Sequence, residues 1–294
     1  MTKSEGMVRI CIAYVTALFV GGASLYLLDH GPLLDALVAD LIATGVIFLF
    51  SRLYRNSSCY DAYWSVVPPL LALYWLAVGD SAASSLRELL VLGLILYWAT
   101  RLTLNWAYYW EGMQHEDWRY LMLRQRAPRW AVLTDLFGIH LLPTLQVFAG
   151  LLPVYAVYCL GERPFGWLDL LACAVTAGAI TLQMVADFQL HRFIAGRAPG
   201  EQLDSGLWAW SRHPNYFGEL GFWCGLFLFG LAAYPQGWYW FGAGIVLMTL
   251  MFLLASIPMM EQRSLERRPE YQRIIDSVSM LVPWPRKRLP SRAG

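Results

Sequence analysis

Residues 211–219 read SRHPNYFGE, and residues 220–234 continue as LGFWCGLFLFGLAAY. The first segment carries Arg, His, Asn and Glu, whereas the second carries no charge. Pro214 favours a helix start at this point, because proline lacks the N–H that the first helical position leaves unbonded. A polar helix start joined to a long apolar run indicates a helix that enters a lipid bilayer, where ionisable groups are costly and mark functional sites.

The rest of the chain has the composition of an integral membrane protein. Of its 294 residues, 57% are hydrophobic and 15% are charged, whereas soluble domains carry about 25% charged residues. Apolar runs long enough to cross ~30 Å of hydrocarbon recur along it. We expect eight spans, at about 8–28, 33–50, 63–79, 88–110, 132–160, 166–190, 215–234 and 237–257. The runs lack the period-2 alternation of a β-barrel, so the predicted fold class is all-α, a polytopic helical membrane protein.

The basic residues predict the orientation of these spans. If the spans alternate in direction, 19 of the 22 Lys and Arg fall on one side, with Arg87 and Arg163 opposite and Arg101 inside a span. Basic residues collect on the cytoplasmic side of membranes. We therefore expect eight transmembrane helices with both termini cytoplasmic, in a multi-pass protein of the bacterial inner membrane.

No repeat or Gly/Ser linker divides the chain, so a single membrane domain over 1–294 is expected. Residues 1–58 would supply two additional N-terminal spans, 59–285 the helical core, and 286–294 a basic tail. We interpret the first 28 residues as a retained span, because their apolar stretch is longer than the core of a signal peptide. The five cysteines are scattered without a C-x-x-C motif and predict neither a disulfide framework nor a metal site.

Polar residues near the span ends are the candidate site. Asn215 and Glu219 are four residues apart and share one helix face. Polar residues also lie near the ends of three other predicted spans. They are Asp61 at the start of the third, Arg101 and Asn105 on the fourth, and Gln183, Asp187 and His191 on the sixth. With the expected orientation they lie in the cytoplasmic half, so we expect a shared hydrated cavity. Alternatively, Arg101 and Asp187 could simply pair with other charges, and Asp61 could cap its helix.

The loop over 191–214 presents Arg192, Arg197 and Arg212 beside a helix N-terminus. Guanidinium groups and free backbone N–H groups both bind phosphate. A soluble anionic cofactor or substrate entering from the cytoplasm is therefore expected. The sequence contains no G-x-G-x-x-G, G-x-x-x-x-G-K-[ST] or H-E-x-x-H motif, which argues against Rossmann, P-loop and zincin chemistry.

The segment GLWAWSRHPNYFGE, residues 206–219, resembles the signature of the membrane steroid 5α-reductase family and its bacterial relatives. The similarity covers about residues 60–285 and includes DAYW, RLTLNW, QMVADFQ and MEQRSLERRPEY. Sterol C14 and C7 reductases carry close variants. Isoprenylcysteine and phospholipid methyltransferases carry a related R-H-P-x-Y-x-G motif. The presence of both Asn215 and Glu219 favours a resemblance to the reductases over one to these methyltransferases.

The resemblance implies hydride transfer from NADPH to the β-carbon of an enone, in a pocket open to the cytoplasm and to lipid. It places the nicotinamide half and the riboses on Gln183, Asp187, Asn215 and Glu219. The remaining cofactor-binding residues that it implies are Asn105, Arg192, Arg197, Arg212, His213, Tyr216 and Glu261. The implied catalytic residues are Asp61, Tyr97, Trp98 and Arg101. Trp98 stands where the steroid enzymes have a tyrosine, and an indole cannot relay a proton.

The expected function is therefore an NADPH-dependent oxidoreductase acting on CH–CH groups, similar to a 3-oxo-steroid 4-ene reductase. Its substrate would be a steroid-like, isoprenoid or fatty enone that enters from the bilayer, with neither a metal nor a nucleic acid involved. The alternative is an S-adenosylmethionine-dependent membrane methyltransferase of the isoprenylcysteine or phospholipid type. A third possibility is a transporter or scaffold whose polar stripe conducts a solute.

Overall fold

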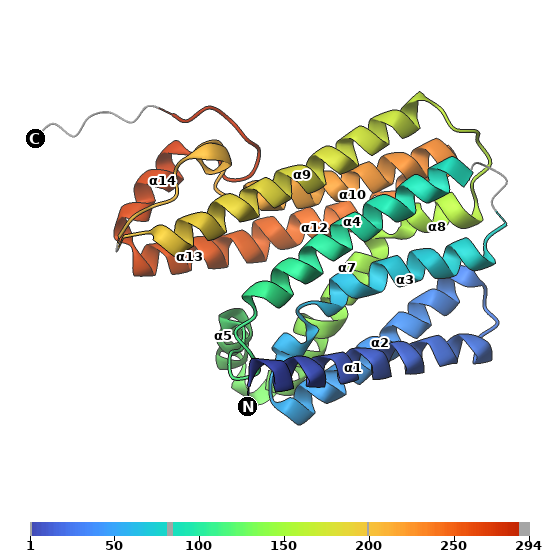
Figure 1. Cartoon of the computed structure of the whole chain (residues 1–294), viewed down its shortest axis with the longest axis horizontal. Helices are drawn as coiled ribbons and strands as arrows, with labels where there is room; N and C mark the ends of the chain where they lie inside the picture. Colours follow the sequence, from blue (N-terminus) through green and yellow to red (C-terminus); the bar gives the residue numbers. More distant parts are fainter. Residues whose placement is uncertain (1, 81–84, 199, 288–294) are drawn as a thin grey trace, which may run out of the picture.

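The computed structural model describes residues 2–80, 85–198 and 200–287, and its helices run back and forth between two ends of an elongated bundle (Figure 1). The described residues form helices and no strands, which confirms the predicted all-α class. The α- and π-helices are α1 Lys3–Ser24, α2 Pro32–Tyr54, α3 Tyr63–Val78, α4 Ser85–Tyr109, α5 Trp118–Arg126, α6 Ala131–Leu133, η4 Thr134–Leu141, α7 Leu142–Gly150, α8 Leu152–Cys159, α9 Trp167–Gly196, α10 Pro214–Ala233, α11 Trp238–Phe241, α12 Ala243–Met251, η7 Phe252–Ser256, α13 Ile257–Arg267 and α14 Gln272–Ser277. The 3₁₀ turns are η1 Leu25–Leu27, η2 Ser57–Tyr60, η3 Pro128–Trp130, η5 Gly206–Ala209, η6 Pro235–Gly237 and η8 Pro269–Tyr271.

Seven helical stretches in the described part of the chain are long and apolar enough to cross a membrane. They are Lys3–Leu27, Pro32–Tyr54, Ser85–Tyr109, Pro128–Gly150, Trp167–Gly196, Pro214–Ala233 and Pro235–Arg267. The third expected span, 63–79, forms α3, which has 16 residues. At ~1.5 Å per residue this helix covers about 24 Å and is shorter than a hydrocarbon core. The molecule is thus a polytopic helical membrane protein, with seven helices of sufficient length where eight were expected.

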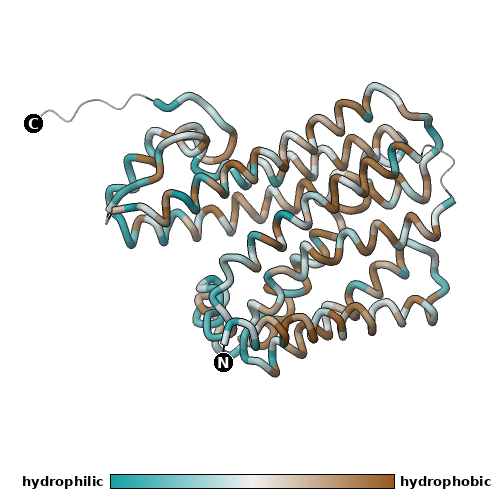
Figure 2. Tube along the Cα trace, viewed as in Figure 1, coloured by the Kyte–Doolittle hydropathy of each residue, from teal (hydrophilic) through white to brown (hydrophobic). Residues whose placement is uncertain are grey.

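The distribution of polarity along the bundle fits this interpretation. Hydrophobic residues cover the middle of the helices, and hydrophilic residues gather toward the ends and connections (Figure 2). α1 begins at the same end of the bundle at which α5 and α14 lie (Figure 1). The end of α9 and the start of α10 point to this end too. The basic tail expected at 286–294 is described at residues 286 and 287, and its remainder lies outside the described residues.

α9 and α10 make the closest helix pair that bears on the site. A Cβ atom added at Gly218 would lie 2.6 Å from Cγ of Gln183, and one added at Gly221 would lie 3.0 Å from Cβ of Ala179. Gly225 approaches Thr176 in the same way. Small residues spaced along one face let two membrane helices pack backbone to backbone. The glycines of α10 therefore hold the polar face of α9 directly against the polar start of α10.

The opposite end of the bundle is closed by a buried ion pair. Arg87 of α4 is 1% exposed and donates from Nε to Oδ1 of Asp169 at 2.6 Å. Its other nitrogens donate to Asp169 Oδ2 at 2.8 Å and to the carbonyls of Arg163 and Pro164 at 2.8 and 2.9 Å. A buried guanidinium is tolerated when all its donors are bonded. This pair joins the start of α4 to the start of α9.

Candidate functional site

Three helices bring their polar residues together in one hydrogen-bonded cluster. Arg101 of α4 donates to Oδ2 of Asp187 on α9 at 2.7 Å, and also to Oε1 of Gln183 one turn away. Asn215 at the start of α10 donates to Oδ1 of Asp187 at 3.4 Å. Residues far apart in the sequence thus share one location, as the sequence predicted. The pairing of Arg101 with Asp187 also matches the alternative that these two charges close the bundle.

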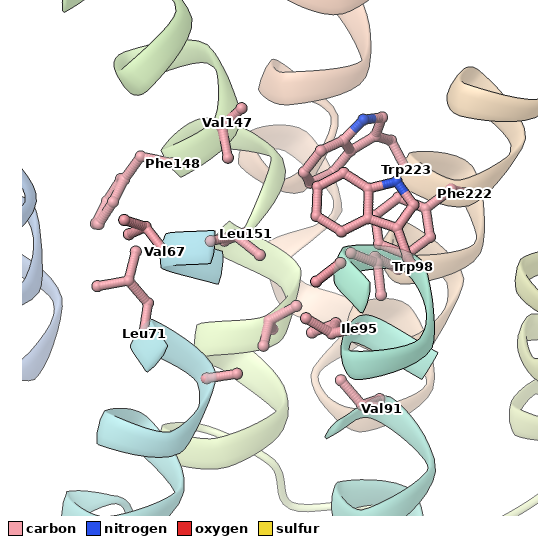
Figure 3. Packing of buried hydrophobic residues seen from close by; sticks show 14 of the residues in the cluster. Val67, Leu71, Val91, Ile95, Trp98, Val147, Phe148, Leu151, Phe222 and Trp223 are labelled. Carbon is pink, nitrogen blue, oxygen red and sulfur yellow. The ribbon is translucent and has the colours of Figure 1, made fainter. Parts of the chain in front are cut away.

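Glu219 continues this cluster into the apolar core. Its two carboxylate oxygens accept from indole N–H groups, Nε1 of Trp98 at 3.1 Å and Nε1 of Trp223 at 2.9 Å. The Trp98 ring stacks on Phe222 with centroids 4.5 Å apart, and Trp223 meets it edge-on at 5.5 Å (Figure 3). A buried carboxylate needs such donors because it has lost its water. In this structure Trp98 therefore serves as a donor to Glu219.

Two buried donor atoms of the cluster are unpaired in the described part of the chain. Nε2 of Gln183 and Nε of Arg101 make no hydrogen bond within the described residues. Gln183 is 1% exposed, and an amide N–H without an acceptor at such a position costs free energy. Both atoms are donors, so they fit a ligand that presents a hydrogen-bond acceptor. Carbonyl and hydroxyl oxygens of a nicotinamide riboside provide such acceptors, and the residues present fit this half of the expected cofactor.

Arg212, His213 and Glu261 form a second polar group at the start of α10. Nε of Arg212 donates to Oε1 of Glu261 at 2.6 Å, and Nε2 of His213 lies 3.2 Å from the same oxygen. NH1 of Arg212 donates to the carbonyls of Ile275 and Val278 at 2.9 and 2.6 Å. Arg212 thus holds the C-terminal segment against α10, and most of its donors are already used.

Tyr216 lies between this second group and the last membrane helix. Its ring stacks on Phe252 at 4.4 Å between centroids and faces His213 at 5.5 Å. The charges of Arg119, Asp117 and Asp187 all act on its phenol. Tyr216 therefore lies within electrostatic range both of Asp187 and of the charged residues at the start of α5.

The arginines that follow α9 remain available for an anion. Arg192 and Arg197 are exposed and make no ion pair among the residues that the structure describes. Burial and then the positive charge of Arg197 lower the pKa of Arg268, so the two guanidinium groups lie within electrostatic range of each other. Two neighbouring cations that have no carboxylate partner among the described residues are suited to a phosphate group. Arg268 could not be predicted as part of the site, since nothing local in the sequence brings it near Arg197.

Asp61 makes no hydrogen bond to the Arg101 cluster among the described residues. Its Oδ1 accepts from the hydroxyl of Tyr120 on α5 at 2.8 Å. Burial raises the pKa of Asp61 to about 7, although the Tyr120 hydrogen bond acts in the opposite direction. A carboxyl group with this pKa is partly protonated at neutral pH and can act as an acid. The contact with Tyr120, 59 residues away in the chain, was missed because no periodicity predicts it.

Three further predicted site residues lie at the margin of the cluster. Tyr97 is 42% exposed, and its hydroxyl lies 3.7 Å from Sδ of Met184. Asn105 is half-buried and has no hydrogen-bond partner within the described ranges. The His191 ring stacks on Tyr109 with centroids 3.5 Å apart. Trp223 was overlooked, although its spacing of four from Glu219 was the signal that could have found it.

The fold and the cluster define a polytopic helical membrane protein with a polar site near one end of its bundle. A family model described as protein of unknown function (DUF1295) matches residues 47–278. The chain belongs to this family, which is related to steroid 5α-reductase-like membrane proteins. A protein of Schizosaccharomyces pombe described as uncharacterised is 28% identical over 280 residues, covering 87% of this chain and 80% of that protein. No solved structure matches the chain.

Proposed function

We propose that this protein is an NADPH-dependent membrane oxidoreductase that reduces a C=C bond conjugated to a carbonyl in a lipophilic substrate. The observation that carries the proposal is the cluster of Arg101, Gln183 and Asp187 with Asn215, in which two buried donors lack an acceptor among the residues that the structure describes. The relationship of the family to steroid 5α-reductase-like proteins supports the same reaction class.

In this proposal the chain holds the cofactor at two places. Gln183, Asp187 and Asn215 would bind the nicotinamide and ribose groups through amide and carboxylate hydrogen bonds. Arg197 and Arg268, with Arg192, would bind the phosphates, because their guanidinium groups have no carboxylate partner in the described chain. When bound, the reduced dinucleotide supplies the hydride.

In this proposal the carboxyl group of Asp61 polarises the carbonyl group of the substrate. Hydride addition to an enone places negative charge on the carbonyl oxygen, and a nearby donor lowers the barrier by stabilising that charge. Asp61 in its protonated form, bonded to Tyr120 at 2.8 Å, is the acid that we assign to this role. The indole of Trp98 is already bonded to Glu219, so it would position this carboxylate and leave the substrate to Asp61.

We also propose that the site opens toward the cytoplasm of a bacterium and receives its substrate from the inner membrane. The support is the predicted excess of Lys and Arg on one side of the spans. A steroid-like, isoprenoid or fatty enone has the polarity to enter from lipid and to present its carbonyl to a polar site.

The test is turnover by the purified protein in lipid nanodiscs. A steroid 4-en-3-one and a fatty enone are each supplied with NADPH, and the reaction is followed by loss of nicotinamide absorbance and by the mass of the product. We expect a gain of two hydrogen atoms in the product, with loss of activity in Asn215→Ala. The variant Glu266→Ala, altered at an exposed residue of α13, is the matched control. Methyl transfer from S-adenosylmethionine without any NADPH oxidation would overturn the proposal.

A further inference from the structure

A buried carboxyl group lies inside the second membrane span. Asp40 of α2 is 5% exposed, and at ~1.5 Å per residue it lies about 12 Å from the start of this helix at Pro32. The hydroxyl of Tyr63 on α3 donates to its Oδ1 at 3.1 Å. Asp40 has no basic partner among the residues that the structure describes. A carboxyl group at this depth is costly, and in membrane proteins such residues mark functional positions.

The helices around Asp40 bring no cation to it. A Cβ atom added at Gly21 of α1 would lie 2.8 Å from the carbonyl oxygen of Ala39, so this part of α1 packs beside Asp40. Residues 17–24 of α1 carry no ionisable side chain, and α7 carries none either. The groups that interact with Asp40 are the phenols of Tyr60 and Tyr63. A carboxylate in such surroundings lacks a counter-charge, which favours its protonated form.

Hydroxyl groups continue from Tyr63 in a chain. Thr44 of α2 lies close enough to act on the Tyr63 phenol, and its Oγ1 lies 3.0 Å from Oγ1 of Thr144 on α7. The Thr144 hydroxyl lies 2.8 Å from the hydroxyl of Tyr60. None of these four side chains is more than 3% exposed. A hydroxyl both donates and accepts, so each member can take up one proton and pass on its own.

His140 of η4 lies between this chain and the end of α2. Its ring lies 5.0 Å from that of Tyr60 between centroids. Its Nε2 is 3.0 Å from Oγ of Ser51, and its Nδ1 is 2.8 Å from the carbonyl oxygen of Asp135. Arg52, next to Ser51, pairs with the Asp135 carboxylate, and the Arg52 side chain is 47% exposed. The buried groups therefore approach the exposed surface at the end of α2.

We propose that Asp40 carries a proton within the membrane and exchanges it through the hydroxyls of Tyr63, Thr44, Thr144 and Tyr60. One step moves the proton of the carboxyl group to a neighbouring hydroxyl, which releases its own proton to the next, and leaves a carboxylate at Asp40. The return step reverses each transfer, so no other reactant is consumed. Asp40 lies before the residues that the family model matches, and this relay does not depend on the proposed reaction.

The protonation state of Asp40 is tested by infrared spectroscopy of the full chain in lipid nanodiscs at pH 7. The spectrum of wild type minus that of Asp40→Asn is expected to show the C=O stretch of one protonated carboxyl group. In Tyr63→Phe, measured in the same way against its own Asp40→Asn variant, this band should move to higher frequency, because the C=O bond stiffens when its oxygen loses a hydrogen bond. Tyr26→Phe, at a residue 93% exposed, should leave the band in place. Absence of the band in wild type, or an unchanged band in Tyr63→Phe, would overturn the proposal.

Exchange in D₂O tests the relay itself. Deuterium moves the same band to lower frequency, and the rate of this change measures exchange of the Asp40 proton. Thr144→Val keeps the shape of the side chain and removes the hydroxyl, so it is expected to slow the exchange about tenfold, as when a barrier rises by one lost neutral hydrogen bond. Thr181→Val, the same substitution at an exposed hydroxyl of α9, is the matched control.

Equal exchange rates in Thr144→Val and Thr181→Val would mean that the hydroxyl groups only join the helices, and would overturn the relay. No dinucleotide is present in either experiment, so the relay can succeed or fail independently of the reductase proposal.

Discussion

Glu219 and Asn215 occupy neighbouring turns of α10 but differ in what surrounds them. Glu219 is 8% exposed and accepts from two buried indoles, whereas Asn215 is half-buried and donates one long bond of 3.4 Å to Asp187. Leaving a buried donor unsatisfied costs about 1–3 kcal/mol. A carboxylate with two indole donors therefore supports the fold as well as the site.

We therefore expect Glu219→Ala and Asn215→Ala to differ in their effects on thermal stability. Glu219→Ala should lower the thermal unfolding midpoint, because the indole N–H groups of Trp98 and Trp223 lose their acceptor, and it should also impair NADPH binding. Asn215→Ala should impair binding and leave the midpoint within a degree or two of wild type. The comparison requires thermal unfolding followed by tryptophan fluorescence in the same detergent, together with an NADPH titration. Equal midpoints in the two variants would refute the structural role of Glu219.

Asp61 predicts a dependence of stability on pH. Its pKa of about 7 in the folded protein lies above the usual value of ~3.9, so the folded state holds this proton more tightly than the unfolded state. The resulting stabilisation is complete below about pH 4 and is lost as the pH rises through 7. We expect the unfolding midpoint of wild type to fall from pH 5 to pH 8 by more than that of Asp61→Asn. Parallel pH curves for the two proteins would show that Asp61 has an ordinary pKa.

At the scale of the helices, the pair of α9 and α10 determines whether the site exists. Gly218 gives α10 its close approach to Gln183, with 2.6 Å from an added Cβ to Cγ of Gln183. Gly218→Ala should displace Gln183 and weaken NADPH binding by about tenfold, since overpacking costs ~1–3 kcal/mol. Gly178→Ala, on α9 where an added Cβ meets nothing within 4 Å, is the matched control. The same affinity in both variants would mean that this contact does not position the site.

The buried ion pair of Arg87 and Asp169 is expected to contribute to the stability of the fold. Both side chains are 1% exposed, and removing one partner of a buried pair costs about 3–5 kcal/mol. Arg87→Leu should therefore lower the free energy of unfolding strongly, and adding Asp169→Leu should restore part of the loss. Unfolding in denaturant at constant detergent concentration measures both. If the double variant were less stable than Arg87→Leu alone, the unpaired charge of Asp169 could not be the cause of the lost stability.

Across the whole molecule, the long apolar runs predicted the helices well because length and hydropathy decide membrane insertion. The third run forms the 16-residue α3, and its polar start at Asp61 pairs with α5, which the hydropathy pattern treats as a loop. The i, i+4 spacing predicted that Asn215 and Asp187 face inward. It gave no information about partners such as Tyr120 or Arg268, because those contacts join segments that only the folded chain brings together.

We propose above all that α4, α9 and α10 together build one dinucleotide site. The most direct measurement is an equilibrium titration of the purified, folded protein with NADPH in lipid nanodiscs, in which the bound fraction is counted with radiolabelled cofactor. We predict saturable binding to one site per chain in wild type and in Glu266→Gln, and binding at least about tenfold weaker in Asp187→Asn. Absence of binding by wild type, or equal binding by Asp187→Asn, would contradict the account.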